Sequence, residues 1–340
     1  MLEHIVHPPP ADTDEEYRAA TTGAALFDHS DFAKILVTGP DAPMFLGNLS
    51  TNDIKNIPLG GGCESYFCDP RGKVLFQTWM YHLRLGVHPH VICVETLPGR
   101  GEALFKHLDR YLISEAVELN DATTEFAQYF LSGPAAARVL QSALGTALPE
   151  LVEFQHVEST FGSNSKASIR RHDWLGAPGY DIVCTKANDE AVWQMLTAAG
   201  ATPASEETWN VLRIEAGRPI FGPDIDENRF VMEVGDAERA VSYTKGCYLG
   251  QEPIVMARDR AGHAPRSFVQ VKLPEDVVVV PGAKVLAGSD EIGSITSSCV
   301  SPKWHSSVAL GYVRWKHREP GTVVNVETES GLAAGEVMKR

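Results

Sequence analysis

A strand, a Gly-Pro corner and a helix follow one another twice in this chain. The first copy runs from the β-prone residues 34–37 through Gly39-Pro40, and the second from residues 129–131 through Gly133-Pro134. Apolar residues at helical spacing follow each corner. Such a recurrence predicts two similar α+β halves. On pattern alone, a chance recurrence stays open as the alternative.

The chain has 340 residues, and at roughly 150 residues per domain this length predicts two or three domains. After about residue 267 helical periodicity gives way to short β-rich runs, 277–280 among them, separated by Pro and Gly. This pattern is typical of a small barrel or sandwich. We therefore predict an N-terminal α+β half (1–120), a second α+β half (121–266) and a C-terminal antiparallel β-barrel (267–340).

The composition disfavours several classes of function. The formal net charge is −14, so broad nucleic-acid binding gains no generic phosphate attraction. No apolar run approaches the length of a membrane span, and the first residues lack a secretory pattern. The six cysteines form no C-x-x-C pair. We expect a cytoplasmic protein with reduced thiols, no resident metal and no nucleotide fingerprint.

The segment 244–266 holds the most distinctive chemistry. Gly246 and Gly250 bracket Cys247, and Lys245 precedes it. A cation and the start of a helix near residue 252 would both favour the thiolate form of Cys247. The alternative, a small buried hydrophobe beside an aromatic residue, stays open.

The same segment is the richest local cluster of cations in this acidic chain. Arg258 and Arg260 follow the cysteine closely, and they are candidates for holding an anionic ligand tail. A solvated loop of arginines is the alternative. By contrast, the acidic residues Asp224, Asp226, Glu227 and Glu233 lack calcium-loop spacing, so we expect a solvated turn there.

A second candidate site lies around the turn at 176–179. Trp174 precedes this turn and Asp181 follows it. An aromatic ring and a carboxylate could frame a flat heterocycle, with the carboxylate accepting ring N–H bonds. An ordinary loop and strand end is the other interpretation.

The eight residues 245–252, KGCYLGQE, resemble the signature of the YgfZ-type folate-binding proteins. These proteins are relatives of the aminomethyltransferase, or T-protein, of the glycine cleavage system. Residues 23–54, 68–74, 213–228 and 291–313 resemble other parts of that superfamily, so the resemblance covers nearly the whole chain. It implies two related α/β-sandwich halves around a central folate-binding hole, plus the barrel.

The resemblance also implies a function. It suggests non-covalent binding of tetrahydrofolate or a derivative, and support of iron–sulfur cluster assembly or repair in client enzymes. A contribution to tRNA modification would follow through those enzymes, without direct contact with nucleic acid. Cys247 would be the functional thiol, with Lys245 beside it.

Departures from the aminomethyltransferases bear on the activity. The acidic residue that works beside the reacting folate nitrogens corresponds here to Phe76-Gln77, and an amide supplies neither charge nor proton acceptor. An acidic loop of those enzymes corresponds to 175–178. Asp181 keeps the acidic position of the following strand, and Gln251 replaces a commonly basic residue. The folate contacts that the resemblance suggests are Asp181, Phe76, Gln77, Tyr248, Gln251, Arg258, Arg260 and Trp174.

Three hypotheses follow, and whether the chain is an enzyme stays open. The first is a folate-binding accessory protein for iron–sulfur enzymes that works through Cys247. The alternative is a tetrahydrofolate-dependent, aminomethyltransferase-like one-carbon transferase or demethylase. The third is a scaffold whose folate hole has closed.

Overall fold

The computed structural model describes residues 13–86, 88–235, 237–275, 277 and 279–339. The chain divides into two compact units. Unit 1 contains Met1–Ala42, Ile57–Cys63 and Trp79–Trp209, and unit 2 contains Pro43–Asn56, Glu64–Thr78 and Asn210–Arg340. Each unit is therefore built from three segments that are separated in the sequence by segments of the other unit. The domain boundaries at 120 and 266 stay a prediction.

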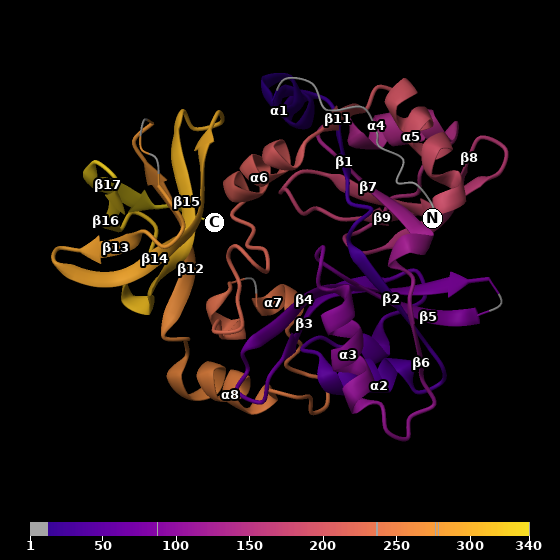
Figure 1. The fold of residues 1–340 in the computed structure, drawn as a ribbon, viewed down its shortest axis with the longest axis horizontal. Coiled ribbons are helices and arrows are strands. Elements are labelled where there is room, and N and C mark those ends of the chain that lie inside the picture. Colours follow the sequence, from indigo (N-terminus) through magenta and orange to yellow (C-terminus); the bar gives the residue numbers. More distant parts are fainter. Residues whose placement is uncertain (1–12, 87, 236, 276, 278, 340) are drawn as a thin grey trace. The chain divides into compact units, whose positions relative to one another are not determined.

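A six-stranded sheet lies wholly within unit 1. Its strand order is β11 (Thr202–Ala204), β1 (Ala25–Asp28), β7 (Phe126–Ser132), β10 (Gly179–Thr185), β9 (Ser165–Arg171) and β8 (His156–Phe161). The helices α4 (Ala136–Leu144) and α5 (Asp189–Ala198) pack together against it (Figure 1). Leu140 and Trp193 from these helices join Tyr129 and Ile182 from the sheet in one core.

A five-stranded sheet repeats this topology. Its order is β3 (Gly62–Cys68), β4 (Val74–Leu85), β5 (His88–Thr96), β2 (Ala33–Thr38) and β6 (Glu118–Asp121). Along the chain, α2 (Ala42–Leu49) follows β2 and α3 (Gly101–Tyr111) follows β5, as α4 and α5 follow β7 and β10. The strand orders β3-β4-β5-β2 and β8-β9-β10-β7 match position by position. The prediction of two related α+β halves is confirmed.

The two Gly-Pro corners recur for a steric reason. Gly39 has φ 105° and Gly133 has φ 129°, a backbone conformation that residues with a side chain rarely adopt. A Cβ on Gly39 would lie 2.1 Å from the carbonyl oxygen of Ala116, and one on Gly133 would lie 2.6 Å from that of Gly23. Both corners therefore require glycine in order to pass against another backbone segment.

The C-terminal strands form a closed antiparallel barrel within unit 2, as predicted (Figure 1). Their order is β12 (Arg266–Leu273), β15 (Ser306–Arg314), β14 (Asp290–Ser301), β13 (Lys284–Ala287), β16 (Val323–Thr328) and β17 (Gly331–Val337). The strand expected at 277–280 is wrong for the described residues 277, 279 and 280; residue 278 lies outside the described part. Val279 is buried in the barrel core and Val277 packs against it, whereas Val280 is exposed.

The remaining helices are short. They are α1 (Thr13–Thr22), α6 (Glu206–Glu215), α7 (Ala237–Ala240) and α8 (Gln251–Met256), which continues as a π-helical turn, Ala257–Ala261. Single 3-10 turns lie at Ile54–Asn56, Thr123–Glu125, Lys186–Asn188, Val231–Glu233 and Trp315–His317. Within the described residues, every helix is too short or too polar to cross a membrane.

Candidate functional site

Lys245 fixes the start of the KGCYLGQE segment (245–252) in unit 2. Its ammonium donates hydrogen bonds to the backbone carbonyls of Gly47, Ser50 and Asn52 at 2.5 to 2.9 Å, and it lies 4.6 Å from the centroid of the Tyr248 ring. An ammonium has three donors, and three carbonyls accept them. The structure therefore gives Lys245 an anchoring role, while its expected catalytic role stays a prediction.

Gly250 brings the same segment against the turn at 68–72. Its φ is 83°, and an added Cβ would lie 2.5 Å from the carbonyl oxygen of Asp69 and 3.1 Å from the Cβ of Cys68. The Leu249 N–H also donates to the carbonyl of Asn48 at 2.9 Å. Residues 47–52, 68–72 and 245–250, which belong to three stretches that carry the family resemblance, thus meet within unit 2.

Cys247 differs from the other cysteines in its access to solvent. It is exposed, whereas Cys63 and Cys299 are half-buried and the other three are buried. Burial raises the pKa of Cys93, Cys184 and Cys299 to about 12, so these groups remain thiols at neutral pH. An exposed thiol on an anchored loop is open to partners and reagents. The buried interpretation of Cys247 is therefore wrong.

The expected folate contacts at 248–260 are only partly brought together. Tyr248, Gln251 and Arg260 line one shallow surface hollow. Arg258 is exposed, pairs with Asp259 at 2.5 Å and lies 4.4 Å from the Tyr243 ring centroid. The Tyr248 hydroxyl is buried and lacks a hydrogen-bond partner within the described residues. As folate contacts these residues stay predictions.

Gln77 is buried in unit 2 and ties its strand to a distant loop. Its Oε1 accepts a hydrogen bond from the Phe221 N–H at 3.0 Å, while its Nε2 donates to the Pro219 carbonyl at 3.4 Å and to Glu64 Oε1 at 3.2 Å. Phe76, also buried, packs edge-on against Phe67. The amide at position 77 therefore uses both its donor and its acceptor to hold the loop at 219–221.

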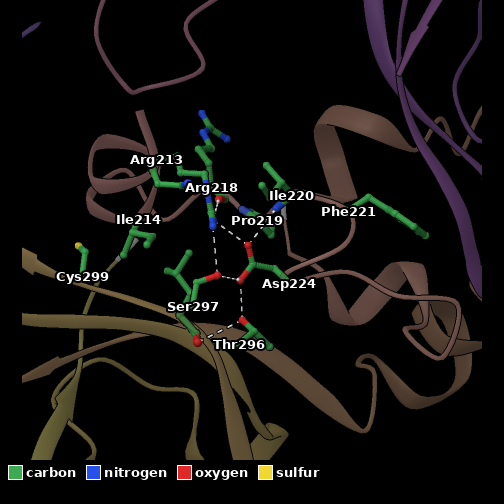
Figure 2. Close-up of polar contacts among 12 residues, drawn as sticks. Arg213, Ile214, Arg218, Pro219, Ile220, Phe221, Asp224, Thr296, Ser297 and Cys299 are labelled. Atoms are coloured by element: carbon green, nitrogen blue, oxygen red, sulfur yellow. Dashed lines mark hydrogen bonds and ion pairs between the residues drawn. The ribbon is translucent and has the colours of Figure 1, made fainter. Parts of the chain in front are cut away.

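The same loop is fixed to the barrel by a buried ion pair. Arg213 Nη1 lies 2.7 Å from Asp224 Oδ2, and the hydroxyls of Thr296 and Ser297 donate to Asp224 Oδ1 at 2.6 and 2.7 Å (Figure 2). Asp224 is 2% exposed, so the expected solvated turn is wrong at this position. A carboxylate can remain buried here because four donors surround it, including the Ile220 N–H.

In unit 1, Asp181 and Trp174 are joined through His172. Asp181 Oδ2 lies 2.9 Å from His172 Nδ1, and Oδ1 accepts from Gln128 Nε2 at 3.1 Å. Trp174 stacks on His172 with ring centroids 5.1 Å apart. Burial opposes the charge of Asp181, but the interaction with His172, the proximity of His29 and the hydrogen bond from Gln128 outweigh it and hold the pKa of Asp181 below its usual value. Sequence reasoning missed His172 as the link between the two.

His29 extends this aromatic cluster. Its ring is stacked between Phe32 and Phe130, with centroids 4.6 and 5.6 Å away, and edge-on to Trp209. Burial lowers the pKa of His29 to about 4, so the ring is neutral at pH 7. Asp181 and Trp174 are both nearly inaccessible inside this packing, and their contact with a pterin stays a prediction. Within the described residues, no cluster of three or more His, Cys, Asp or Glu side chains is placed to bind a metal ion.

Comparison with known proteins identifies the family. The model of the GCVT N-terminal domain matches residues 10–245, and that of the glycine cleavage T-protein C-terminal barrel domain matches residues 266–340. The chain belongs to the glycine cleavage T-protein family. The superfamily that the sequence resembles is thereby confirmed, whereas the YgfZ branch within it stays a prediction.

Relatives and a solved structure extend this result. The chain is 28% identical over 317 residues to the aminomethyltransferase of Geobacillus kaustophilus, covering 92% of this chain and 85% of that one. It is 28% identical over 298 residues to the aminomethyltransferase of Rubrobacter xylanophilus, covering 88% and 78%. The structure of glycine cleavage system aminomethyltransferase T from Bartonella henselae matches with a TM-score of 0.85 at 23% identity, covering 97% and 89%. This last similarity supports the fold.

Proposed function

We propose that this protein binds tetrahydrofolate or a derivative non-covalently. The observation that carries the proposal is the match of both parts of the chain to the T-protein family. The similarity to aminomethyltransferases over about nine-tenths of the chain supports it. Calorimetric titration with 5-formyltetrahydrofolate tests it directly. Saturable heat near one ligand per chain is expected, and a titration without saturable heat would leave the scaffold hypothesis in its place.

The finer proposal is a YgfZ-type accessory role in iron–sulfur cluster assembly or repair, with Cys247 as the working group. Two observations favour it over carboxylate-based transfer. Cys247 is exposed on a loop that Lys245 anchors. At the acidic position of the aminomethyltransferases this chain has Gln77, whose amide is already hydrogen-bonded. Client enzymes would be the partners, and any effect on tRNA would pass through them.

The alternative is an aminomethyltransferase-like one-carbon transferase or demethylase. The names of the similar proteins favour it more than they favour the accessory role. It predicts formation of methylene- or methyltetrahydrofolate from tetrahydrofolate and a small amine donor by the purified protein. Chromatography of the folate products measures this, and turnover that survives Cys247→Ser would establish the alternative.

A complementation experiment separates the two roles. Cells lacking this protein receive the wild type, Cys247→Ser, or Cys63→Ser as a control at a half-buried cysteine. The accessory role predicts that Cys247→Ser alone fails to restore iron–sulfur enzyme activity, although it keeps its fold and its folate binding. Full restoration by Cys247→Ser would remove the proposed role of the thiol.

A further inference from the structure

Unit 1 contains a cavity of about 460 Å³ that the proposed function does not use. Strands of both sheets line it: β2, β4 and β5 from one, and β8, β9 and β10 from the other. Its rim includes the exposed residues Arg84, Glu158 and Lys166, whereas its floor is buried. No residue suggested as a folate contact lines it, and its volume lies in the ordinary range for small-molecule sites.

The floor of this cavity carries hydrogen-bond donors that the protein leaves unused. Ser168 and Arg170 lie on the same face of β9, because their numbers differ by two, and both are less than a tenth exposed. Within the described residues, the Ser168 hydroxyl and the Arg170 Nε have no hydrogen-bond partner. Buried polar groups are nearly always paired, so two orphans on one floor indicate a missing acceptor.

Lys34 adds a buried positive charge to the same floor. It is 1% exposed, and its ammonium donates to the Phe32 carbonyl at 2.7 Å. No carboxylate of the described residues pairs with this ammonium within ion-pair distance. The charge of Arg170, in contrast, is neutralised by its ion pair with Glu95. Burial lowers the pKa of Lys34, and Glu95, which lies opposite it on β5, is already paired with Arg170, so an anion in the cavity would favour the ammonium.

The remaining lining residues indicate what the rest of the ligand must be like. Leu36, Leu83 and Val183 supply buried apolar surface beside these donors. Arg84 and Lys166 at the rim would attract an anion, and they outnumber Glu158 there. A single negative charge on an apolar body matches this combination of a buried lysine, unused hydrogen-bond donors and apolar walls.

We propose that this cavity is a binding site for a small organic carboxylate, separate from the folate site. The carboxylate would accept hydrogen bonds from Lys34, Ser168 and Arg170 Nε, and the apolar body would lie against Leu36, Leu83 and Val183. The inference rests only on unit 1, so it does not depend on whether the protein binds folate.

The test uses the full chain and 2-naphthoate, a rigid apolar carboxylate, as the probe. 2-Naphthamide is the matched neutral compound, and calorimetry measures both. One saturable naphthoate site is expected, with the amide weaker by about tenfold or more because hydrogen bonds to charged groups are the stronger ones. Equal binding of acid and amide would overturn the proposal, since the buried cation would then contribute nothing.

Two substitutions and a control locate the site. Ser168→Phe fills the cavity and should abolish naphthoate binding. Lys34→Met keeps the side-chain length, removes the charge and should weaken binding by about tenfold or more. Lys284→Met, the same change at an exposed residue of the barrel, should leave binding unchanged. Unchanged binding in both cavity variants contradicts the proposal, as would a cavity that only holds water and gives no saturable signal.

Two further measurements complete the experiment. Thermal unfolding checks that the variants are folded; if Lys34→Met is not, Ser168→Phe and the acid–amide comparison decide. Competition with 5-formyltetrahydrofolate separates the two sites, and we expect it not to displace naphthoate. Competitive displacement, together with loss of folate binding in Ser168→Phe, would make this cavity the folate site and end the claim of a second one.

Discussion

Replacing Asp224 by leucine should loosen the loop at 216–228 and its attachment to the barrel. The carboxylate is held by Arg213 at 2.7 Å, by the hydroxyls of Thr296 and Ser297, and by the Ile220 N–H at 3.1 Å (Figure 2). Both members of the ion pair are almost fully buried. Asp224→Leu leaves the guanidinium of Arg213 inside the protein without its counter-charge.

The expected magnitude follows from these contacts. Removing one partner of a buried ion pair costs about 3–5 kcal/mol. Arg213 would keep its hydrogen bonds to Asn210, Ser297 and the Arg218 carbonyl, so the lower end of that range applies. Arg213→Met with Asp224→Leu removes both charges, and apolar replacement of a buried pair is often neutral. The double variant should therefore be more stable than either single one.

Native-state hydrogen exchange is the suitable assay, because a chain with two units need not unfold in one step. A loss of about 3 kcal/mol should speed exchange of the protected amides in β14 and in the loop about 100-fold. Asp259→Leu is the control, since it breaks the exposed pair with Arg258. The reasoning fails if Asp224→Leu exchanges no faster than this control, or if the two single effects simply add in the double variant.

Three further predictions concern the other sites. Burial lowers the pKa of His29 to about 4, so below about pH 6.5 this residue takes up a proton in the unfolded chain but not in the native one. The free energy of unfolding should therefore fall by about 3 kcal/mol between pH 6.5 and pH 4. His29→Phe should remove that part of the pH dependence of Tm. Gly250→Ala should cost clearly more than Gly262→Ala in denaturant unfolding, since both have positive φ but only Gly250 meets other atoms within 4 Å; equal costs would refute the close approach to Asp69. Lys245→Met should speed amide exchange across 245–252 while Lys272→Met does not, because only Lys245 holds the carbonyls of 47–52; equal exchange in both would refute the anchoring role.

Local signals in the sequence predicted the fold well. The corners at Gly39 and Gly133 mark places where the backbone must pass close to another segment, and only glycine permits this. Each corner lies between a strand and a helix. The recurrence of the corner therefore predicted that the whole α+β half occurs twice. The strand predicted at 277–280 was wrong because an apolar residue indicates burial without fixing the backbone conformation; Val279 is buried in the barrel core outside any strand.

The polar contacts were not predictable in this way. Lys245 finds its carbonyl partners nearly 200 positions earlier in the chain, and Asp224 finds the Thr296 and Ser297 hydroxyls more than 70 positions later. Periodicity tells which face of an element is buried, but it does not tell which remote group neutralises a charge there. Asp224 therefore looked solvated, although it is among the most buried carboxylates of the described chain.

Gln77 shows how one buried side chain fixes a loop remote in sequence. Its Nε2 donates to the Pro219 carbonyl and to Glu64, and a carboxylate at this position could donate to neither. A glutamate would also place a second negative charge near Glu64, whose oxygen lies 3.2 Å from the present amide nitrogen. Gln77→Glu should therefore loosen the loop at 219–221. The amide, which both donates and accepts a hydrogen bond there, is part of how that loop is held.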